Sequence, residues 1–204
     1  DVNKIHFILI KEQNRKKILK KIDDIFFEKK KIKIDNLNIK NINLNSLYDD
    51  KDTVLIKKLL QYFIPNEDKE FILSKLFEEF VNEDIEIFAK KIYLNSNHVK
   101  EMYSNKMKFG SHGDNHKWLE FLDKNEQEKE MKESLNFFKE LGIDDQDISI
   151  CYPYGSYNKE TLALAEKLNF SFGVTTKVGN VDISNIENKY QLNRFDTNEF
   201  KNLN

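Results

Sequence analysis

Two histidines spaced four positions apart are the residues of this chain best suited to chemistry. His112 and His116 lie in the segment FGSHGDNH, which covers positions 109–116. Imidazole nitrogens suit zinc and related transition metals. The two side chains can converge if the loop turns helically, and Gly110 and Gly113 permit a tight backbone path. Two solvated loop histidines would give the same pattern, and a catalytic metal site needs at least one more protein ligand.

A second segment, CYPYGSY at positions 151–157, combines turn residues with aromatic rings. Pro153 fixes a turn, and Gly155 allows close approach of another group. Tyrosines in such a turn can form a wall that stacks on sugar rings and bonds to their hydroxyls. A plain strand–helix turn with packing tyrosines is the alternative interpretation.

The elements that must position these segments are short strands alternating with helices. We expect a strand over 108–111 before the histidines and another over 147–152 before the tyrosines. Between them, residues 125–141 form an amphipathic pattern that ends at Gly142. The pattern continues with a helix over 158–168 and strands over 171–175 and 191–195. This order predicts parallel βα units, in which functional groups gather at the carboxyl ends of the strands.

Residues 1–106 have a different, mostly helical texture. Apolar residues from Ile18 to Phe26 follow helical spacing, a further helix should stop before Pro65, and Asn66 can cap the next one. Helical patterns also cover 85–93 and 96–102. Residues 32–47 alternate imperfectly, which indicates either a strand pair or a loosely ordered connection. We therefore divide the chain into a mainly helical region, 1–106, and a βα region, 107–204.

Composition excludes several classes of protein. The 204 residues are 39% hydrophobic and 33% charged, which is typical of a soluble globular protein; the length is enough for one domain, and two are possible. A net charge of −2 gives no electrostatic reason to expect nucleic acid or an anionic membrane as a partner. The single cysteine, Cys151, cannot form an internal disulfide. No apolar run approaches the roughly 20 residues that span a bilayer. A cytoplasmic location is the default expectation, on the condition that no export signal precedes Asp1.

Together, the two segments resemble the motifs of a known family. Gly-Ser-His-x3-His resembles the second motif of the polysaccharide deacetylases of the NodB-homology type (carbohydrate esterase family four), and Tyr-Pro-Tyr-Gly-Ser-Tyr resembles their third motif. One long helix separates the two motifs, as in that family. The segments FGVTT (172–176) and LNRF (192–195) resemble late strands of the branch that processes cell-surface polysaccharides. The resemblance is specific from about Leu94 onward and loose across the helical region, which we interpret as an insertion.

The resemblance implies an α/β fold, namely an incomplete distorted (β/α) barrel, and a hydrolase that removes acetyl groups from an acetylated sugar or polysaccharide. Members hold a divalent metal with one aspartate and two histidines, which here would be His112 and His116. We expect zinc, with cobalt, iron or nickel as alternatives. Tyr154 would supply a backbone N–H to the oxyanion. The resemblance implies that the sugar groove is lined by Tyr152, Pro153, Tyr154, Gly155, Tyr157 and Trp118.

Three departures from the family pattern stand out. The opening motif, Thr-Phe-Asp-Asp-Gly, is absent: no adjacent aspartate pair (23–24, 49–50 or 144–145) follows an apolar strand or precedes glycine. Cys151 stands where many members have arginine, and a thiol cannot make arginine's bidentate contact to a carboxylate. No histidine follows His116, so the late general acid is missing. Arg194 stands near that place and is a candidate to bind a carboxylate or steady the transition state.

Three hypotheses follow. The leading one is a metal-dependent deacetylase that is incomplete as given, with its aspartates in an N-terminal piece outside these residues. Such a piece, or a homo-oligomer, would cover the open edge of the barrel. The alternative is a catalytically inactive, truncated homologue that retains a carbohydrate-binding groove or a partial metal site. The weakest is a helical interaction protein built on residues 1–106.

Overall fold

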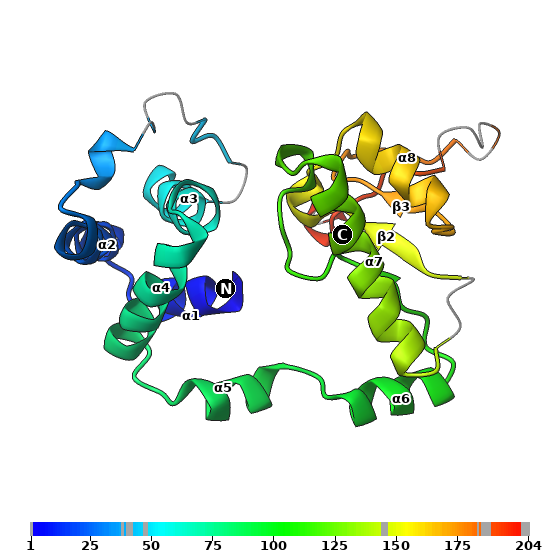
Figure 1. Cartoon of the computed structure of the whole chain (residues 1–204), viewed down its shortest axis with the longest axis horizontal. Coiled ribbons are helices and arrows are strands. Elements are labelled where there is room, and N and C mark those ends of the chain that lie inside the picture. Colours follow the sequence, from blue (N-terminus) through cyan, green and yellow to red (C-terminus); the bar gives the residue numbers. More distant parts are fainter. Residues whose placement is uncertain are drawn as a thin grey trace. The chain divides into compact units, whose positions relative to one another are not determined.

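The computed structural model describes residues 2–37, 39, 43–46, 49–143, 147–182, 184 and 189–200. It divides the chain into two compact units, Asp1–Tyr93 and Leu94–Asn204 (Figure 1). The first unit is helical. The second contains a small parallel sheet with helices beside it.

The first unit is helical, as the sequence predicts. Its elements are α1 (Val2–Lys11), α2 (Arg15–Lys30), the 3-10 turn η1 (Ile34–Asn36), α3 (Lys51–Lys58), the π-helical turn η2 (Leu59–Phe63), α4 (Asn66–Phe80) and α5 (Ile85–Ile92). Asn14 caps α2 by accepting a hydrogen bond from Lys17 N. The predicted cap at Asn66 is wrong, because Asn66 is itself the first residue of its helix and Pro65 precedes it without a side-chain cap. In the part of 32–47 that the structure describes, η1 is present and no strand is, so the predicted strand pair is wrong there.

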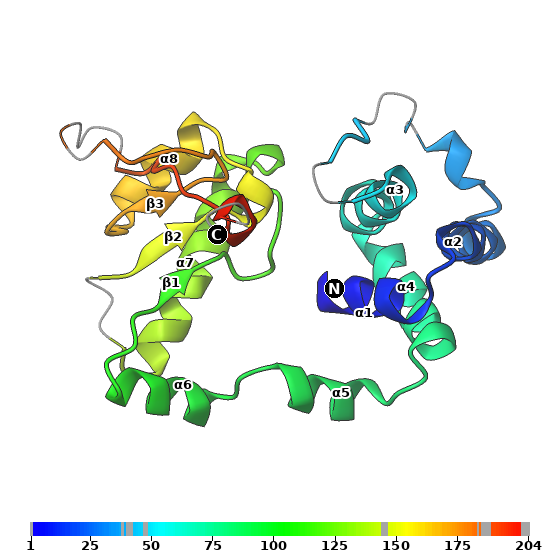
Figure 2. The same ribbon diagram turned by 180° about the vertical axis from the view of Figure 1, so that it is seen from behind.

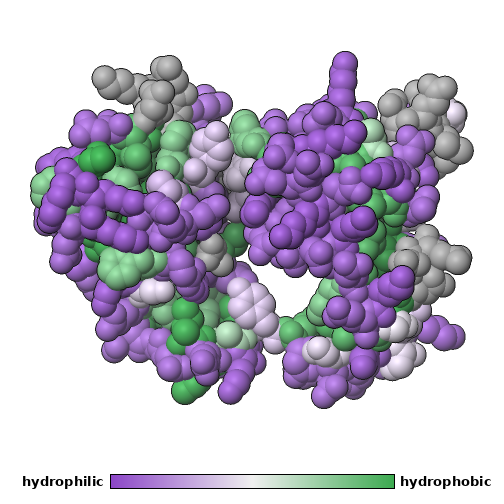
Figure 3. Space-filling view, in the orientation of Figure 1, coloured by the Kyte–Doolittle hydropathy of each residue, from purple (hydrophilic) through white to green (hydrophobic). Residues whose placement is uncertain are grey.

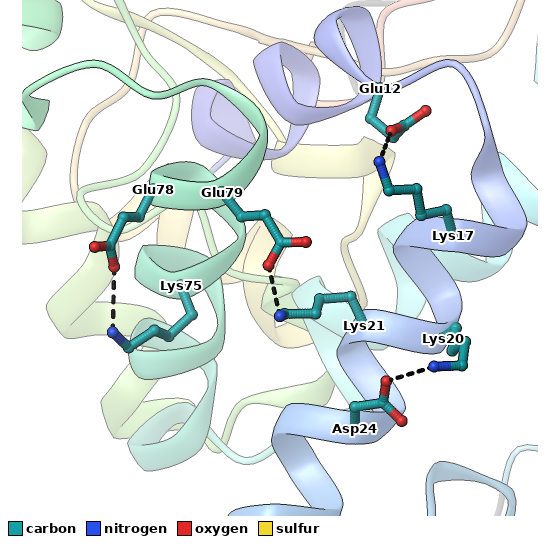
Figure 4. Close-up of polar contacts among 8 residues, drawn as sticks. All are labelled: Glu12, Lys17, Lys20, Lys21, Asp24, Lys75, Glu78 and Glu79. Carbon is teal, nitrogen blue, oxygen red and sulfur yellow. Dashed lines mark hydrogen bonds and ion pairs between the residues drawn. The ribbon is translucent and has the colours of Figure 1, made fainter.

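Apolar burial holds this unit together. Helix α2 packs against α3 and α4, and α1 packs against α4. Ile18 and Ile22 of α2 and Leu76 of α4 are fully buried in one cluster. Figure 4 shows the polar contacts at the surface, where Lys21 Nζ on α2 lies 2.5 Å from Glu79 Oε2 on α4. Because such exposed ion pairs contribute about 0–1 kcal/mol each, the packing of the helices stabilises the unit far more than they do.

One carboxylate in this unit is fully buried. Asp68 is 0% exposed, and its two carboxylate oxygens lie 2.8 Å from Lys29 Nζ and 3.1 Å from Lys30 Nζ at the end of α2. Bonding to Lys29, and then to Lys30, lowers the pKa of Asp68 below its usual 3.8. This ion-pair cluster therefore ties α4 to α2 only while the carboxylate is charged.

Replacing Asp68 with asparagine should lower the melting temperature of the first unit by several degrees near neutral pH, because it breaks a buried ion pair. A pKa lowered by folding gives stability that is present above the unfolded value and lost as the pH falls through the folded value. The gap between wild type and Asp68→Asn should therefore close in acid. Thermal unfolding of both proteins, followed by circular dichroism near neutral pH and again in acid, checks this. Glu67→Gln, at an exposed partner of Lys30, is the control. An equal gap at both pH values would contradict the assignment.

The elements of the second unit are α6 (Ser96–Ser104), β1 (Gly110–Ser111), η3 (Leu119–Phe121), α7 (Lys124–Glu140), β2 (Ser149–Cys151), η4 (Pro153–Gly155), α8 (Lys159–Lys167), β3 (Gly173–Val174) and η6 (Thr197–Phe200). The strands pair in the order β1-β2-β3, and both pairs are parallel (Figure 2). Gly110 aligns with Ser149, and Ile150 aligns with Gly173. The predicted parallel βα units and the α/β class are confirmed.

The strands are shorter than the sequence predicts, and the prediction of a strand over 191–195 is wrong. Only Leu192 bridges to Val174 there. Gly173 N donates to Lys189 O, and Gly173 O accepts from Leu192 N. In a regular parallel ladder, the two hydrogen-bond partners of one residue are two positions apart. The partners of Gly173, Lys189 and Leu192, are three positions apart, which interrupts the ladder. The segment therefore follows β3 without forming a regular strand.

Helix α7 covers the sheet. It packs against β1 and α8 (Figure 2). Met131 and Phe138 of α7 belong to the same buried cluster as Ile150 of β2. Asp123 and Glu126 form a capping box at its start. Hydrophilic residues cover most of each unit on the face shown in Figure 3. Among the described residues, no helix has the length and apolar character needed to cross a membrane.

Candidate metal and carbohydrate site

The two predicted histidines lie together at the carboxyl end of β1. Their ring centroids are 4.6 Å apart and their planes meet at 75°. His112 Nδ1 lies 2.6 Å from the carbonyl oxygen of Cys151 at the end of β2. Because a carbonyl only accepts, Nδ1 carries the proton, and the lone pair of His112 is on Nε2. This is the tautomer in which a second group fixes a metal-binding imidazole.

His116 is held in an unusual state. Its φ of 56° lies in the left-handed region, which costs a non-glycine residue about 1–2 kcal/mol. Its Nδ1 is buried without a hydrogen-bond partner. Burial, and then the neighbouring His112, lowers the pKa of His116, which favours the neutral ring. Interaction with the Cys151 side chain is the main reason that the pKa of His112 is raised. A strained, neutral imidazole with an unpaired buried nitrogen fits a cation site.

A carboxylate ligand is missing from the described part of the chain. No group of three His, Cys, Asp or Glu residues there could hold a metal ion. Asp114 is exposed, and its Oδ2 accepts from Asn115 Nδ2 at 2.7 Å. The pairs at 23–24 and 49–50 belong to the first unit, and 144–145 lie outside the described residues. Two histidines alone would supply only two of the four ligands of a tetrahedral zinc site.

The tyrosine segment brings an aromatic ring against the histidines. Tyr154 has a φ of 59°, and its ring meets that of His116 edge-on at 4.6 Å. Burial raises the pKa of its hydroxyl to about 12, so the hydroxyl is neutral at physiological pH. Tyr152 and Pro153 are buried instead, and the Tyr152 hydroxyl donates to Tyr190 O at 2.8 Å. These two residues therefore pack inside the unit and support the turn without lining an exposed groove.

Trp118 extends the aromatic surface. Its indole stacks on Tyr154 with centroids 4.4 Å apart and planes 10° apart. It is half-buried, and its Nε1 is buried without a partner. Tyr157 lies against Tyr152 at 5.0 Å. His112, His116, Tyr154 and Trp118 are therefore one contiguous cluster.

Cys151 and Arg194 lie at the His112 side of this cluster. Interaction with His112 lowers the pKa of the Cys151 thiol, and the charge of Arg194 adds to the effect. Arg194 is exposed, and its backbone N–H donates to Lys177 O at 3.0 Å. In the sequence, Cys151 stands out only as a departure from the family pattern, and its role in orienting His112 through its carbonyl was missed. No sequence signal marks such a backbone role.

Comparisons with known proteins show the family of this chain. The family model for polysaccharide deacetylases matches residues 70–173, about half of the chain. The chain therefore belongs to the polysaccharide deacetylase family, as the resemblance predicted.

Two relatives add detail. The YxkH protein of Bacillus subtilis (strain 168), which bears a polysaccharide deacetylase name, is 37% identical over 89 residues. That match covers 44% of this chain and 32% of the relative, so the chain spans about a third of its length. The solved structure of the Streptococcus pyogenes deacetylase PplD in complex with acetate is 38% identical, with a TM-score of 0.46. It covers 50% of this chain and 44% of that chain.

Proposed function

We propose that this chain carries the histidine half of the active site of a metal-dependent deacetylase acting on an acetylated carbohydrate. The observation that carries the proposal is the cluster at the end of β1 and β2. There, the centroids of two imidazole rings lie 4.6 Å apart; a carbonyl orients one ring, and the other is half-buried with a buried Nδ1 that has no hydrogen-bond partner. Family membership supplies the reaction class.

His112 and His116 would hold the divalent metal, for which zinc suits imidazole ligands best. When bound, such a metal lowers the pKa of a water molecule and polarises the acetyl carbonyl. The Cys151 carbonyl keeps the His112 lone pair on Nε2. The backbone N–H of Tyr154 is the proposed donor to the oxyanion, and Arg194 is the proposed cation for a carboxylate or the developing charge.

The aromatic surface is the proposed sugar site. The apolar faces of sugar rings stack on aromatic side chains, and Tyr154 and Trp118 present such a surface beside the histidines. Tyr157 and Gly155 continue the same turn. Tyr152 and Pro153, which the resemblance places in the groove, take part by supporting it.

The missing carboxylate defines the rest of the proposal. We infer that the aspartate ligand and the general base come from a segment beyond these 204 residues, on a longer chain or a separate piece. The distorted (β/α) barrel of the family would then be completed beside β1. Both histidines would then be metal ligands, and no ligand from the first unit would be needed.

Acetate release tests the function. A longer polypeptide that joins a Thr-Phe-Asp-Asp-Gly segment to this chain, loaded with Zn²⁺, should release acetate from N-acetylglucosamine oligomers. His112→Ala in the same polypeptide should remove the activity. If the loaded wild-type polypeptide releases no acetate, the proposed function is wrong.

A second candidate is carbohydrate binding without catalysis. It is favoured by the lack of a third metal ligand in the described part of the chain. It predicts that the 204-residue chain binds acetylated oligosaccharides and that Trp118→Ala weakens this binding. Under this function, His112→Ala would change metal content and leave sugar binding intact.

A further inference from the structure

Helix α7 holds the histidine loop at two points, each directly before a histidine. Ser111 precedes His112, and its Oγ lies 2.6 Å from Ser134 Oγ. Asn115 precedes His116, and it is bound by Glu130. Glu130 and Ser134 are four residues apart and therefore lie on one face of α7. The spacing of the two contacts matches the spacing of the two histidines.

The Glu130 contact is the stronger of the two. Glu130 is 3% exposed, and its Oε2 accepts from Asn115 N at 2.8 Å while Oε1 accepts from Asn115 Nδ2 at 2.9 Å. Lys117 Nζ lies 3.5 Å from Oε1, on the other side of His116. Hydrogen bonds to a charged acceptor in a buried setting are about twice as strong as neutral ones. A single carboxylate therefore fixes the residues on both sides of His116.

This anchoring explains how His116 stays in a left-handed conformation. The strain of that φ persists only where the surrounding contacts determine the backbone. Glu130 supplies such contacts. Among the described residues, no hydrogen bond joins it to either imidazole, and it has no role in the proposed chemistry. It is also a buried charge, which is costly unless a specific arrangement uses it.

We propose that Glu130 is a positioning residue that sets the His112–His116 geometry by binding Asn115, with Ser134 as the second, weaker anchor through Ser111. The inference rests on the proposed function for its consequence, which is metal affinity. The placement of the two imidazole rings by α7 does not depend on that function.

The test uses a matched pair of substitutions on α7 in the full 204-residue chain. Glu130→Met removes the carboxylate with little change in size. Gln127→Met makes the same kind of change one turn earlier, at a residue that is 0% exposed and bonded to Leu122 O and Thr161 Oγ1, away from the loop. Both should cost stability. Only Glu130→Met should weaken Zn²⁺ binding, by about 10–100-fold, the usual effect of a lost outer-shell contact.

Imidazole NMR signals of the metal-free protein give a readout that general destabilisation does not move. The His112 and His116 signals should shift in Glu130→Met and stay in place in Gln127→Met. If Glu130→Met does not fold, Asn115→Ala removes the side-chain bonds to Glu130 and Asp114 at an exposed residue but keeps the backbone bond to Glu130, and it should shift the same signals by less. Unshifted signals in the folded variant would overturn the inference. If the wild type binds no Zn²⁺ but the signals shift as expected, the proposed metal function fails and the positioning role stands.

Discussion

Replacing His116 with alanine is expected to weaken Zn²⁺ binding by more than about 100-fold, beyond the effect of losing an outer-shell contact. The reason is the loss of one of the two imidazoles at the end of β1, because a single imidazole cannot chelate. Competition against a chromophoric chelator measures the affinity. His98→Ala is the matched control, because His98 is an exposed residue of the α6 capping box, away from the cluster.

The backbone strain at His116 separates lost binding from lost folding. Alanine keeps the cost of the left-handed φ, whereas His116→Gly removes about 1 kcal/mol of it. His116→Gly should therefore be at least as stable as His116→Ala and bind Zn²⁺ equally poorly. Zn²⁺ affinity close to wild type in both variants would contradict the assignment of His116 as a ligand.

Replacing Gly155 with alanine is expected to destabilise the second unit by about 2–4 kcal/mol, from a left-handed φ and from overpacking. The φ is 71°, and an added Cβ would collide with the Thr176 side chain, approaching Thr176 Cγ2 to 2.8 Å. Thr176 follows β3, so the collision would push the tyrosine turn, residues 151–157, away from the sheet. Trp118 is the only tryptophan and lies in the second unit, so its fluorescence reports the unfolding of that unit in urea.

Gly142 provides the control for this prediction. Its φ is 73°, and a Cβ there meets no heavy atom within 4 Å. Gly142→Ala should therefore cost only the backbone strain, about 1–2 kcal/mol. The difference between the two variants isolates the contact with Thr176. Equal destabilisation would show that the tyrosine turn does not depend on that contact.

The local features of the fold could be predicted because they depend on short-range rules. A helix that stops before Pro65 and another that ends at Gly142 were expected, and the structure has both: η2 ends at Phe63 and α7 ends at Glu140. Strands with helices between them made a parallel sheet predictable. The irregular course of 189–194 could not be predicted, because it depends on which carbonyl lies opposite Gly173 after folding.

The site divides in the same way. The spacing of His112 and His116 and their place after a strand were sufficient to predict that they lie together. Glu130 could not be singled out, because α7 contains five glutamates and only the position of Asn115 in space distinguishes one of them. The stacking of Trp118 on Tyr154 is likewise a long-range contact between two turns. Sequence spacing therefore identified the groups of the cluster, and tertiary contacts determine how they are held.

The central claim is that His112 and His116 share one metal ion. X-ray absorption at the zinc edge of the Zn²⁺-loaded chain tests it most directly. We predict one Zn²⁺ per chain, with imidazole nitrogens at about 2.0–2.1 Å and no sulfur at about 2.3 Å. We also predict that the imidazole scattering is lost in His112→Ala. A sulfur ligand would place Cys151 in the coordination shell, and an absence of imidazole scattering would separate the histidines from the metal; either result would contradict the claim.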